Sequence, residues 1–275
     1  MKYSIITVSY NNCEGLRRTI ESVIHQNFRD FEFIIIDGGS TDGSTDVLKA
    51  YDEHISYWVS EKDAGIYNAM NKGIKKATGD YLNFMNSGDC FFSSDILEKV
   101  SLYNSEADFI VGKDYHFNEH SGQGHASIQP PRTTMIHFFN ATLDHQSCFI
   151  KRELFNNTPY REDYRLVSDW IFFTEKIVNE GKRVQFISDI VCRREDGGLS
   201  VQEHDRNREE INKFLHQFLP QGVYNDYATL SHLDKTSLYR LFDICENDKC
   251  RKALVFCIKL INRFLYRFCP NNNGR

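Results

Sequence analysis

Residues 3–44 read YSIITVSYNNCEGLRRTIESVIHQNFRDFEFIIIDGGSTDGS and carry two strand signals with a helix signal between them. The runs Tyr3–Ser9 and Glu32–Asp37 are short and rich in β-branched residues, which is typical of strands buried in a parallel sheet. Apolar residues recur at helical spacing between the two runs, at Leu16, Ile20, Val23 and Ile24. Together they predict a strand–helix–strand unit, whose crossover is almost always right-handed.

The alternation of strand and helix signals continues through the N-terminal part of the chain. A helix is expected after the loop Gly38–Ser44, a strand at Ser56–Ser60, and a helix whose apolar face runs from Ile66 to Ala77. The turn after this helix leads into another strand signal, Tyr81–Met85. This order predicts an α/β fold with a mostly parallel sheet flanked by helices.

The pattern is looser beyond residue 110. Strands are expected at Phe109–Gly112 and Ser147–Ile150, and a helix rich in aromatic residues at Trp170–Val178. The polar segment Gly122–Thr134 holds two of the five prolines and is predicted to be a loop. From Val201 onward the sequence becomes helical and strongly charged.

Composition excludes several classes of protein. The chain has 275 residues, is 41% hydrophobic and carries a net charge of −5, so it can bury a core and shows no sign of disorder or nucleic-acid binding. Its eight cysteines form no CxxC pair, and polar residues follow the first strand too soon for a signal peptide. We therefore expect reduced thiols and a cytoplasmic protein. No apolar run is long enough to span a bilayer.

Acidic residues follow three of the expected strands. Asp37, Asp63 and Asp89 each stand at or just after the end of a strand signal. In open α/β sheets ligands bind outside the carboxyl ends of the strands, where converging carboxylates suit sugar hydroxyls, a base N–H group or a divalent cation. Each of these aspartates alone could simply form a turn or cap a helix. The three together favour a binding site.

Two common nucleotide-binding motifs are absent. A dinucleotide-binding GxGxxG turn should follow the first strand, but that position, Ser9–Gly15, reads SYNNCEG. Gly38, Gly39 and Gly43 follow the second strand at the wrong spacing, and no phosphate-binding GxxxxGK[ST] loop occurs. A dehydrogenase and a P-loop enzyme are therefore disfavoured.

The N-terminal ninety residues resemble family 2 glycosyltransferases. The matching segments, in the order and spacing of that family, are Ile6–Asn11 (ITVSYN), Asp37–Ser44, Ser60–Gly73 and Ala77–Asp89. Shorter matches follow at His145–Ser147, Ser168–Trp170 and Gly197–Ser200. The last is either a loop that closes over the site or an ordinary turn. The resemblance implies a Rossmann-like GT-A fold over residues 1–200. Residues 1–110 would form the nucleotide-sugar-binding half, 111–200 the acceptor-binding half, and 201–275 a helical extension.

The resemblance also implies a set of donor-binding residues. Thr7, Tyr10 and Asp37 would hold the base and ribose of a nucleotide-sugar, with UDP favoured over GDP. Asp63 would contact the nucleotide, and Asn71 and Lys72 would lie near the phosphates. Lys72 is equally compatible with a solvated helix surface.

Two acidic residues carry the implied chemistry. Asp89 falls in the segment that binds Mg²⁺ or Mn²⁺ in relatives, and such an ion stabilises the charge that develops on the leaving diphosphate. Asp169 falls where relatives place the base that takes the proton of the acceptor hydroxyl, and one base opposite the leaving group implies inversion. The segment Asn86–Asp89 has one carboxylate where many relatives have several, and Ser168 replaces a second acid that often precedes the base. Asp169 could instead cap the helix that follows it.

Three further residues are candidates for contact with the acceptor or the donor sugar. His145 and Gln146 precede an expected strand, and Trp170 could pack on the face of a sugar ring. The alternatives are a structural role for His145 and a place in the core for Trp170.

Residues 251–269 read RKALVFCIKLINRFLYRFC. On a helix, Lys259, Arg263 and Arg267 form one basic stripe among apolar residues, a pattern typical of peripheral contact with a membrane. A helix docked on the catalytic domain or in a dimer interface would have a similar pattern. Membrane contact would place the protein on the inner face of the cytoplasmic membrane, near lipid-linked acceptors.

The sequence therefore predicts an inverting transfer of a sugar from a nucleoside-diphosphate sugar to the hydroxyl of a saccharide or lipid-linked saccharide. A nucleotide-sugar-binding protein without turnover is the alternative, because the expected metal-binding segment, Asn86–Asp89, contains a single carboxylate. A nucleotidyltransferase is weaker still, since its glycine- and lysine-rich N-terminal loop is missing.

Overall fold

The computed structural model describes residues 3–103, 106–118, 122–130, 132–195, 202–231, 244–245 and 247–268. The chain divides into two compact units, Met1–Pro220 and Gln221–Arg275. The second unit contains the helices α9 (Gln221–Leu230) and α11 (Asp248–Phe268). No helix in the described part of the chain is both long and apolar enough to cross a membrane.

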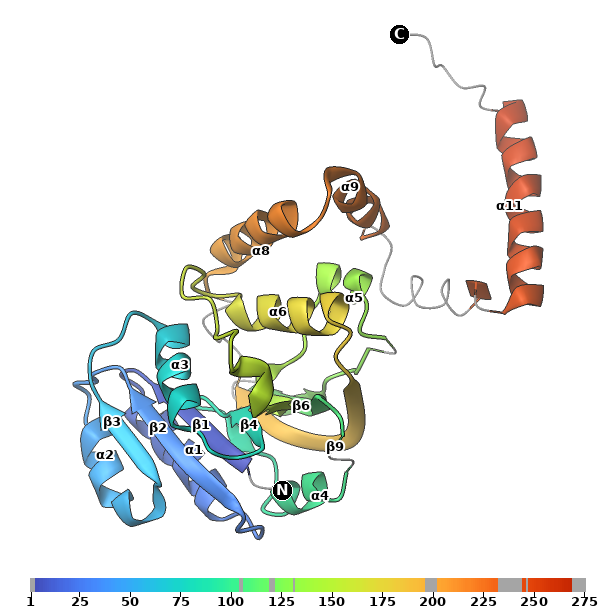
Figure 1. Ribbon diagram of the computed structural model, residues 1–275. Helices are drawn as coiled ribbons and strands as arrows, with labels where there is room; N and C mark the ends of the chain where they lie inside the picture. Colours follow the sequence, from blue (N-terminus) through green and yellow to red (C-terminus); the bar gives the residue numbers. More distant parts are fainter. Residues whose placement is uncertain are drawn as a thin grey trace. The chain divides into compact units, whose positions relative to one another are not determined.

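The first unit is built on a nine-stranded sheet with the order β3-β2-β1-β4-β8-β6-β9-β5 (Figure 1). Its N-terminal strands are β1 (Tyr3–Ser9), β2 (Phe31–Asp37), β3 (Tyr57–Ser60) and β4 (Tyr81–Phe84). They are all parallel, so their carboxyl ends, including those of β1 and β2 at the paired residues Ser9 and Asp37, lie on one edge of the sheet.

The rest of the sheet is mixed. Its strands are β5 (Cys90–Phe91), β6 (Phe109–Asn118), β7 (Gln123–Ala126), β8 (Cys148–Lys151) and β9 (Val184–Glu195). Strand β8 is antiparallel to both β4 and β6, whereas β9 runs parallel to β6. Strand β7 pairs with β6 alone, antiparallel to it.

Both faces of β1, β2 and β4 are covered, since successive side chains point to opposite faces and most of those of these strands are buried. On one face, Ile5 and Phe33 share a buried cluster with Leu16 and Ile20 of α1 (Cys13–Ile24). The opposite face is covered by α3 (Ile66–Lys76), where a Cβ at Gly73 would lie 2.6 Å from the side chain of Ile6. Two-sided burial explains why these strands read as continuous apolar runs.

The remaining helices complete the first unit. They are α2 (Ser44–Ala50), η1 (Asp52–His54), α4 (Ile96–Ser101), α5 (Met135–Asn140), η2 (His145–Ser147), η3 (Arg152–Phe155), α6 (Ser168–Phe173) and α8 (His204–Phe218). Helix α6 continues directly as a π-helical turn, Thr174–Asn179. The helices α5, α6 and α8 lie together beyond the β6–β9 part of the sheet (Figure 1).

The predicted α/β architecture is confirmed, with corrections in its second half. Strand β6 extends to Asn118, and part of the expected loop Gly122–Thr134 is the strand β7 that pairs with it. Strand β9 had not been anticipated, and α8 belongs to the first compact unit. The predicted loop Gly197–Ser200 lies outside the described residues.

Candidate active site

The carboxyl ends of β1, β2 and β3 bring together three residues that the sequence assigns to the donor. Gly38 permits this convergence, because a Cβ there would lie 2.7 Å from Asp63 Oδ2 and 3.2 Å from a ring carbon of Tyr10. Tyr10 is 67% exposed, so its ring faces solvent beside the Asp63 carboxylate. An exposed aromatic face next to a hydrogen-bond acceptor suits a nucleoside.

Asp37 organises this edge of the sheet from within. It is fully buried, and its Oδ2 accepts hydrogen bonds from the backbone N–H of Ser40 at 2.9 Å and from the hydroxyl of Ser60 at 2.6 Å. The Ser40 hydroxyl donates to the other oxygen at 2.5 Å. The carboxylate therefore fixes the loop after β2 and ties it to the end of β3.

Three expected donor contacts are engaged elsewhere in the structure. Thr7 is fully buried and its hydroxyl donates to the Met85 carbonyl at 2.6 Å, so it holds β1 to the end of β4. Asn71 is 4% exposed, and its amide bonds both the N–H and the C=O of Tyr160. Lys72 forms a 2.7 Å ion pair with Glu61 on the surface. Polar side chains at these positions hold parts of the fold together, and their donor contacts stay predictions.

Asp169 is the second residue of α6, and both of its carboxylate oxygens accept hydrogen bonds from side chains far away in the sequence. The hydroxyl of Tyr67 donates to Oδ1 at 2.7 Å, and His145 Nδ1 lies 2.8 Å from Oδ2. The helix begins after Val167, and no side chain caps it, so Asp169 does not have the capping role that was its alternative. Its side chain is only 13% exposed.

The environment shifts the pKa values of both members of the Asp169–His145 pair. Burial raises the pKa of Asp169, but the hydrogen bond and charge of His145 and the bond from Tyr67 outweigh it, so that the pKa lies below its ordinary value. Burial lowers the pKa of His145, and the hydrogen bond and charge of Asp169 outweigh it in turn, so that pKa is raised. The pair therefore favours an ionised carboxylate beside a readily protonated imidazole.

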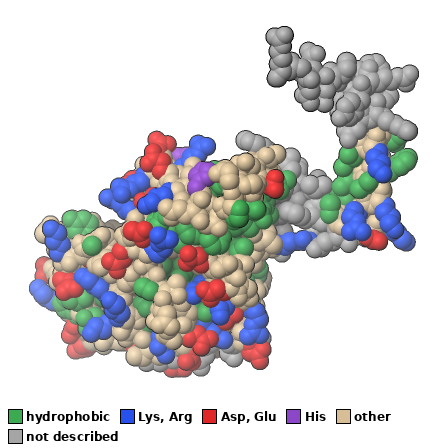
Figure 2. Space-filling model, turned by 45° about the horizontal axis from the view of Figure 1, so that its top comes forward, with side chains coloured by type: hydrophobic (Ala, Val, Ile, Leu, Met, Phe, Trp, Pro, Cys, Tyr) green, Lys and Arg blue, Asp and Glu red, His purple; other side chains and the backbone are tan. Residues whose placement is uncertain are grey.

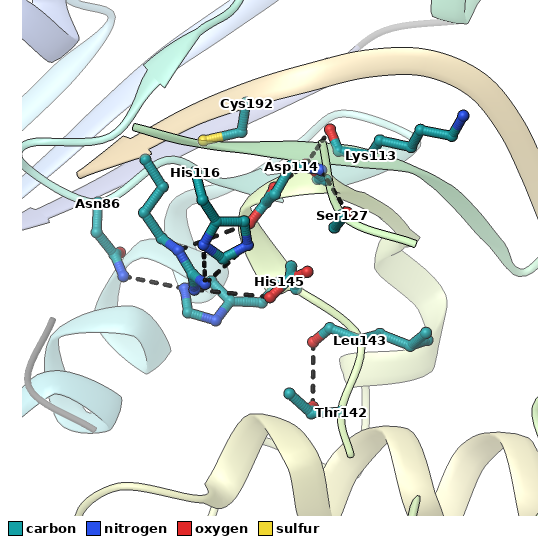
Figure 3. A network of polar contacts seen from close by, with 12 residues as sticks. Asn86, Lys113, Asp114, His116, Ser127, Thr142, Leu143, His145 and Cys192 are labelled. Carbon is teal, nitrogen blue, oxygen red and sulfur yellow. Dashed lines mark hydrogen bonds and ion pairs between the residues drawn. The ribbon is translucent and has the colours of Figure 1, made fainter. Parts of the chain in front are cut away.

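His145 connects this pair to the segment that ends in Asp89. Its Nε2 lies 3.1 Å from Nδ2 of Asn86, the first residue of that segment, as Figure 3 shows. Asp89 is 9% exposed, and its backbone carbonyl accepts a 2.7 Å hydrogen bond from Thr19 of α1. The residue expected to take a proton and the segment expected at the leaving group are thus joined by one chain of hydrogen bonds.

A second polar group lies beside His145, on β6, β9 and the turn before η2. Within the described residues, the ligating atoms of Asp114, His116 and Asp144 lie within 4.8 Å of one another, close enough to share a cation. The guanidinium of Arg194 lies among them, 3.8 Å from Asp114 and 3.6 Å from Asp144, and hydrogen-bonded to the His116 ring (Figure 3 labels Asp114 and His116). Arg194 supplies positive charge to this group.

Asp114 is the most perturbed carboxylate of this group. It is fully buried on β6, between β8 and β9, and its Oδ1 accepts a hydrogen bond from the Ser147 hydroxyl. Burial and the charge of Asp144 raise the pKa of Asp114 to about 7, although Ser147 and Arg194 act in the opposite direction. The charge of Asp89 also raises it, which places Asp89 near the same region.

The residues present fit a divalent cation. Oδ2 of Asp114 is buried and has no hydrogen-bond partner in the described part of the chain, and it lies in the electrostatic reach of Asp89. Carboxylate oxygens are among the hard ligands that Mg²⁺ and Mn²⁺ take in proteins, and Arg194, 3.8 Å from this oxygen, is its present counter-charge.

The remaining acceptor-side candidates are buried. Trp170 is 4% exposed, its ring packs edge-on against Phe214, and its indole N–H donates to the Phe138 carbonyl at 2.8 Å. It therefore takes the core position that was its alternative and does not present a sugar platform. Gln146 is 6% exposed, and its backbone carbonyl accepts from Asn83 at 2.8 Å.

Sequence reasoning missed four residues of this site. Tyr67 lies beside the apolar face that predicts α3, Asp114 lies beyond the expected end of its strand, and Arg194 lies on the unanticipated β9. Asn86 appears in the sequence only as the first residue of the expected metal-binding segment. An alternation of apolar residues would have revealed β9 in the sequence. Because the pairing of β9 with β6 shifts register twice, that alternation is interrupted.

Comparison with known proteins agrees with this geometry. The family model described as glycosyl transferase family 2 matches residues 4–163, more than half of the chain. The chain is 29% identical over 206 residues to a PGL/p-HBAD biosynthesis glycosyltransferase of Mycobacterium bovis, covering 72% of this chain and 78% of the relative. It is 28% identical over 173 residues to glycosyltransferase GlyA of Streptococcus pneumoniae, covering 62% of this chain and 24% of the relative.

Solved structures share the fold at low sequence identity. S. aureus TarS 1–349 in complex with UDP-GlcNAc has a TM-score of 0.62 at 17% identity, with 82% of this chain and 70% of that chain covered. The match to a longer TarS chain spans 45% of that protein. Mannosyltransferase PcManGT from Pyrobaculum calidifontis, in complex with GDP-Man and Mn²⁺, has a TM-score of 0.55 at 14% identity, covering 98% and 88% of the two chains. The resemblance inferred from the sequence motifs is confirmed: the chain belongs to glycosyl transferase family 2 and is a glycosyltransferase with the GT-A fold.

Proposed function

We propose that the protein transfers a sugar from a nucleoside-diphosphate sugar to a hydroxyl of a saccharide or lipid-linked saccharide, with inversion at the anomeric carbon. The observation that carries this proposal is the hydrogen-bonded chain from Asp169 through His145 to Asn86, at the start of the Asp89 segment. These hydrogen bonds connect Asp169, the proposed proton acceptor, to the segment beside which the diphosphate would leave. General-base assistance and stabilisation of the leaving group are the two needs of such a transfer.

The donor would bind at the edge formed by β1, β2 and β3. Tyr10 would stack on the base, and Asp63 would accept hydrogen bonds from the base or ribose, on a loop that Asp37 holds rigid. A uridine nucleotide is favoured, as in the TarS complex with UDP-GlcNAc, and the GDP-Man complex of PcManGT makes guanosine the second choice.

A divalent cation, Mg²⁺ or Mn²⁺, would be held at Asp89. When bound there it would act as a Lewis acid on the diphosphate oxygens. Support comes from the buried Asp114 Oδ2, which has no hydrogen-bond partner in the described residues and lies 3.8 Å from its ion-pair partner Arg194, and from the Mn²⁺ present in the PcManGT complex. Arg194 adds a fixed positive charge on the same side of the site.

The acceptor hydroxyl would attack the anomeric carbon from the side opposite the diphosphate. Its proton would pass to the Asp169–His145 pair, which is only 13–17% exposed and therefore largely shielded from bulk water. A single displacement with one base inverts the anomeric centre.

The helix α11 would bring the enzyme to an anionic membrane surface. Between residues 248 and 268 the chain has six basic side chains and one acidic one, Asp248. Large apolar side chains are exposed on the same helix, with Phe256 62% and Ile261 56% exposed, and Figure 2 shows apolar and basic side chains mixed on it. Such a helix binds an anionic interface through apolar burial and charge together.

Liposome flotation tests the membrane contact. Vesicles with anionic lipids should float the full chain, and deletion of residues 251–275 should abolish flotation. Neutral vesicles serve as the control, and undiminished flotation of the truncated chain would exclude this role for α11.

Thermal stability with ligands tests the donor assignment. The protein is heated with UDP, GDP, UDP-GlcNAc, GDP-mannose or NAD, each with and without Mn²⁺. Stabilisation by one nucleoside diphosphate that grows with Mn²⁺ is expected, because a ligand that binds only the folded state raises the melting temperature. Stabilisation by NAD alone would exclude the proposal. Binding without any turnover would support the alternative of a nucleotide-sugar-binding protein.

A further inference from the structure

We propose that Asn12, the residue that caps α1, and Thr19, within that helix, are positioning residues of the proposed cation site. Together they hold the turn Asn86–Asp89 in the shape in which Asp89 can bind the ion. This inference rests on the proposed function, because it depends on a cation at Asp89. It adds to that site two residues that the donor and acceptor assignments do not use.

The turn Asn86–Asp89 is closed by its own backbone. The Asp89 N–H donates to the Asn86 carbonyl at 2.9 Å, and Gly88 has a φ of 105°. Glycine is favoured in this left-handed conformation at the third position of a tight turn. The Ser87 N–H donates to a carbonyl of β1 at 3.1 Å, which attaches the turn to the end of that strand. The other polar groups of the turn's backbone are bound by side chains of α1.

The Thr19 hydroxyl lies among the backbone groups of the turn. Its oxygen accepts a hydrogen bond from the Gly88 N–H at 3.0 Å. The carbonyl oxygens around it are those of Asp89 at 2.7 Å, Gly15 at 3.0 Å and Asn86 at 3.3 Å. A hydroxyl has one proton, so it donates to one of these carbonyls at a time, and that of Asp89 is the nearest. Thr19 is fully buried, and its one oxygen therefore fixes the backbone before and after Asp89.

Asn12 holds the middle of the turn and caps α1 at the same time. Its Nδ2 donates to the Ser87 carbonyl at 3.0 Å, and its Oδ1 accepts from the Gly15 N–H at 3.2 Å. One partner is an acceptor and the other a donor, and both agree with this orientation of the amide. A Cβ at Gly88 would lie 3.4 Å from the Asn12 amide nitrogen, so the turn lies directly against the cap. The start of α1 and the turn are therefore held together.

Strand β5 holds the turn at its other end. Cys90 of β5 pairs with Arg193 of β9 in antiparallel register, so that Asp89 and Arg194 are the next residues on the two chains. Asp89 is only 9% exposed. It is thus fixed between α1 on one side and β9 on the other.

A ligand on a turn that is already in place binds a cation without reorganisation of the backbone. Hydrogen-bonding groups that orient metal ligands contribute about 10–100-fold to metal affinity. The segment Asn86–Asp89 has a single carboxylate, so the orientation of that one ligand matters more than in a site with several. Loss of the Asn12 or Thr19 hydrogen bonds should therefore lower cation affinity, while the nucleoside-binding edge at Tyr10 and Asp63 stays intact.

Calorimetry of Mn²⁺ binding tests this in the full chain saturated with UDP or GDP, whichever raises the melting temperature of the wild type. Thr19→Val keeps the shape of the side chain but removes its hydrogen bonds, and should weaken Mn²⁺ binding about 10–100-fold. Thr19→Ser keeps the hydroxyl and should bind Mn²⁺ nearly as the wild type does. Asn12→Ser keeps a helix-capping hydroxyl, removes the amide that donates to Ser87, and should also weaken Mn²⁺ binding. Affinity for the nucleoside diphosphate without Mn²⁺ should not change in any of these variants.

Thr174→Val is the matched control. Thr174 is also fully buried, and its hydroxyl donates to the carbonyl four residues earlier at 2.8 Å, a contact that Thr19 also makes with Gly15. The control should lose stability and keep its Mn²⁺ affinity. Unchanged Mn²⁺ affinity in Thr19→Val, an equal loss in Thr174→Val, or a Thr19→Ser as weak as Thr19→Val overturns the proposal.

Hydrogen–deuterium exchange of the segment 84–92 tests the turn without any ligand. Thr19→Val and Asn12→Ser should raise deuterium uptake there, because backbone groups of the turn lose their partners, whereas Thr174→Val should not. Unchanged uptake in both α1 variants overturns the proposal. A wild type that binds no Mn²⁺ with either nucleoside diphosphate contradicts the cation of the proposed function instead, and the uptake still decides whether α1 holds the turn.

Discussion

The Tyr67 hydroxyl, on α3, donates a 2.7 Å hydrogen bond to Oδ1 of Asp169, on α6, across 102 positions of sequence. Tyr67 is 6% exposed, and burial together with the charge of Asp169 raises the pKa of its phenol well above the ordinary value, so it stays protonated and donates. This bond joins the half of the domain that would bind the donor to the half that would bind the acceptor. Much of the candidate site depends on such links between distant elements.

Replacing Tyr67 by Phe should therefore weaken both stability and turnover. Loss of a hydrogen bond to a charged group costs about 1.5–3 kcal/mol in unfolding free energy, and we expect turnover to fall roughly ten-fold as Asp169 loses its orientation. Urea unfolding and nucleoside-diphosphate release measure the two effects. Tyr103→Phe is the matched control, since Tyr103 donates a 2.7 Å bond to Asp189. It should cost stability without lowering turnover, and equal loss of turnover in both variants would contradict this account.

The Asp169–His145 pair should make stability depend on pH in a defined window. Because the pKa of His145 is raised, its contribution is fully present below the unfolded value of about 6.5 and is lost as the pH rises through the folded value. Because the pKa of Asp169 is lowered, its contribution is present above about 3.9 and is lost as the pH falls through the folded value. The pair therefore stabilises most between about pH 4 and 6.5.

Denaturation of the wild type and His145→Gln over pH 4–9 measures this window. The difference in unfolding free energy should be largest near pH 5–6 and should shrink towards pH 9. A difference that grows with rising pH would mean that the pair is not an ion pair in the folded protein.

Arg194 should be needed to keep Asp114 and Asp144 together. Removing one partner of a buried ion pair leaves an uncompensated charge, and Arg194→Gln should cost about 2–4 kcal/mol at pH 8. Asp114→Asn in the same chain should recover part of that loss, because it removes the charge that Arg194 offsets. Asp46→Asn, which breaks an exposed pair with Lys49, should change stability by less than about 0.5 kcal/mol. Full additivity of the two site substitutions would exclude the coupling.

Gly38 should be essential for the donor edge. The Cβ of Gly38→Ala would lie 2.7 Å from Asp63 Oδ2 and 3.2 Å from the Tyr10 ring, so the carboxylate must shift from its present place beside that ring. We expect nucleotide affinity to fall at least ten-fold. Calorimetry measures it with the nucleoside diphosphate, UDP or GDP, that stabilises the wild type against heat. Gly222→Ala, where a Cβ would meet nothing within 4 Å, is the control and should bind as the wild type does. Unchanged affinity of Gly38→Ala would place the donor elsewhere.

The N-terminal half of the fold could be predicted because its strands are buried on both faces. Runs such as Tyr3–Ser9 then have a composition that no surface element shares, and the structure reproduces that strand residue for residue. The second half was harder because β9 lacks a regular alternation: its register with β6 shifts between Val111 and Asp114. The mixed strand directions there also leave no simple repeat of strand and helix.

The site was predictable only in its family motifs. Asp169 and His145 were both predicted as site residues. Their contact, however, joins η2 to the start of α6 across 24 positions, and no local sequence pattern encodes it. The family resemblance implies ligand contacts for Thr7 and Asn71, and in the structure both side chains bond backbone groups of distant segments. Whether a polar side chain serves the fold or a ligand is decided by such long-range partners.

The most direct test of the proposed transfer is nucleoside-diphosphate release by the wild type and Asp169→Asn, with UDP-GlcNAc and GDP-mannose as donors in the presence of Mn²⁺. We predict that the wild type releases the diphosphate of one donor and that Asp169→Asn binds that donor but releases it at least 10²-fold more slowly. Equal release by the two proteins, or none by the wild type with either donor, would contradict the account.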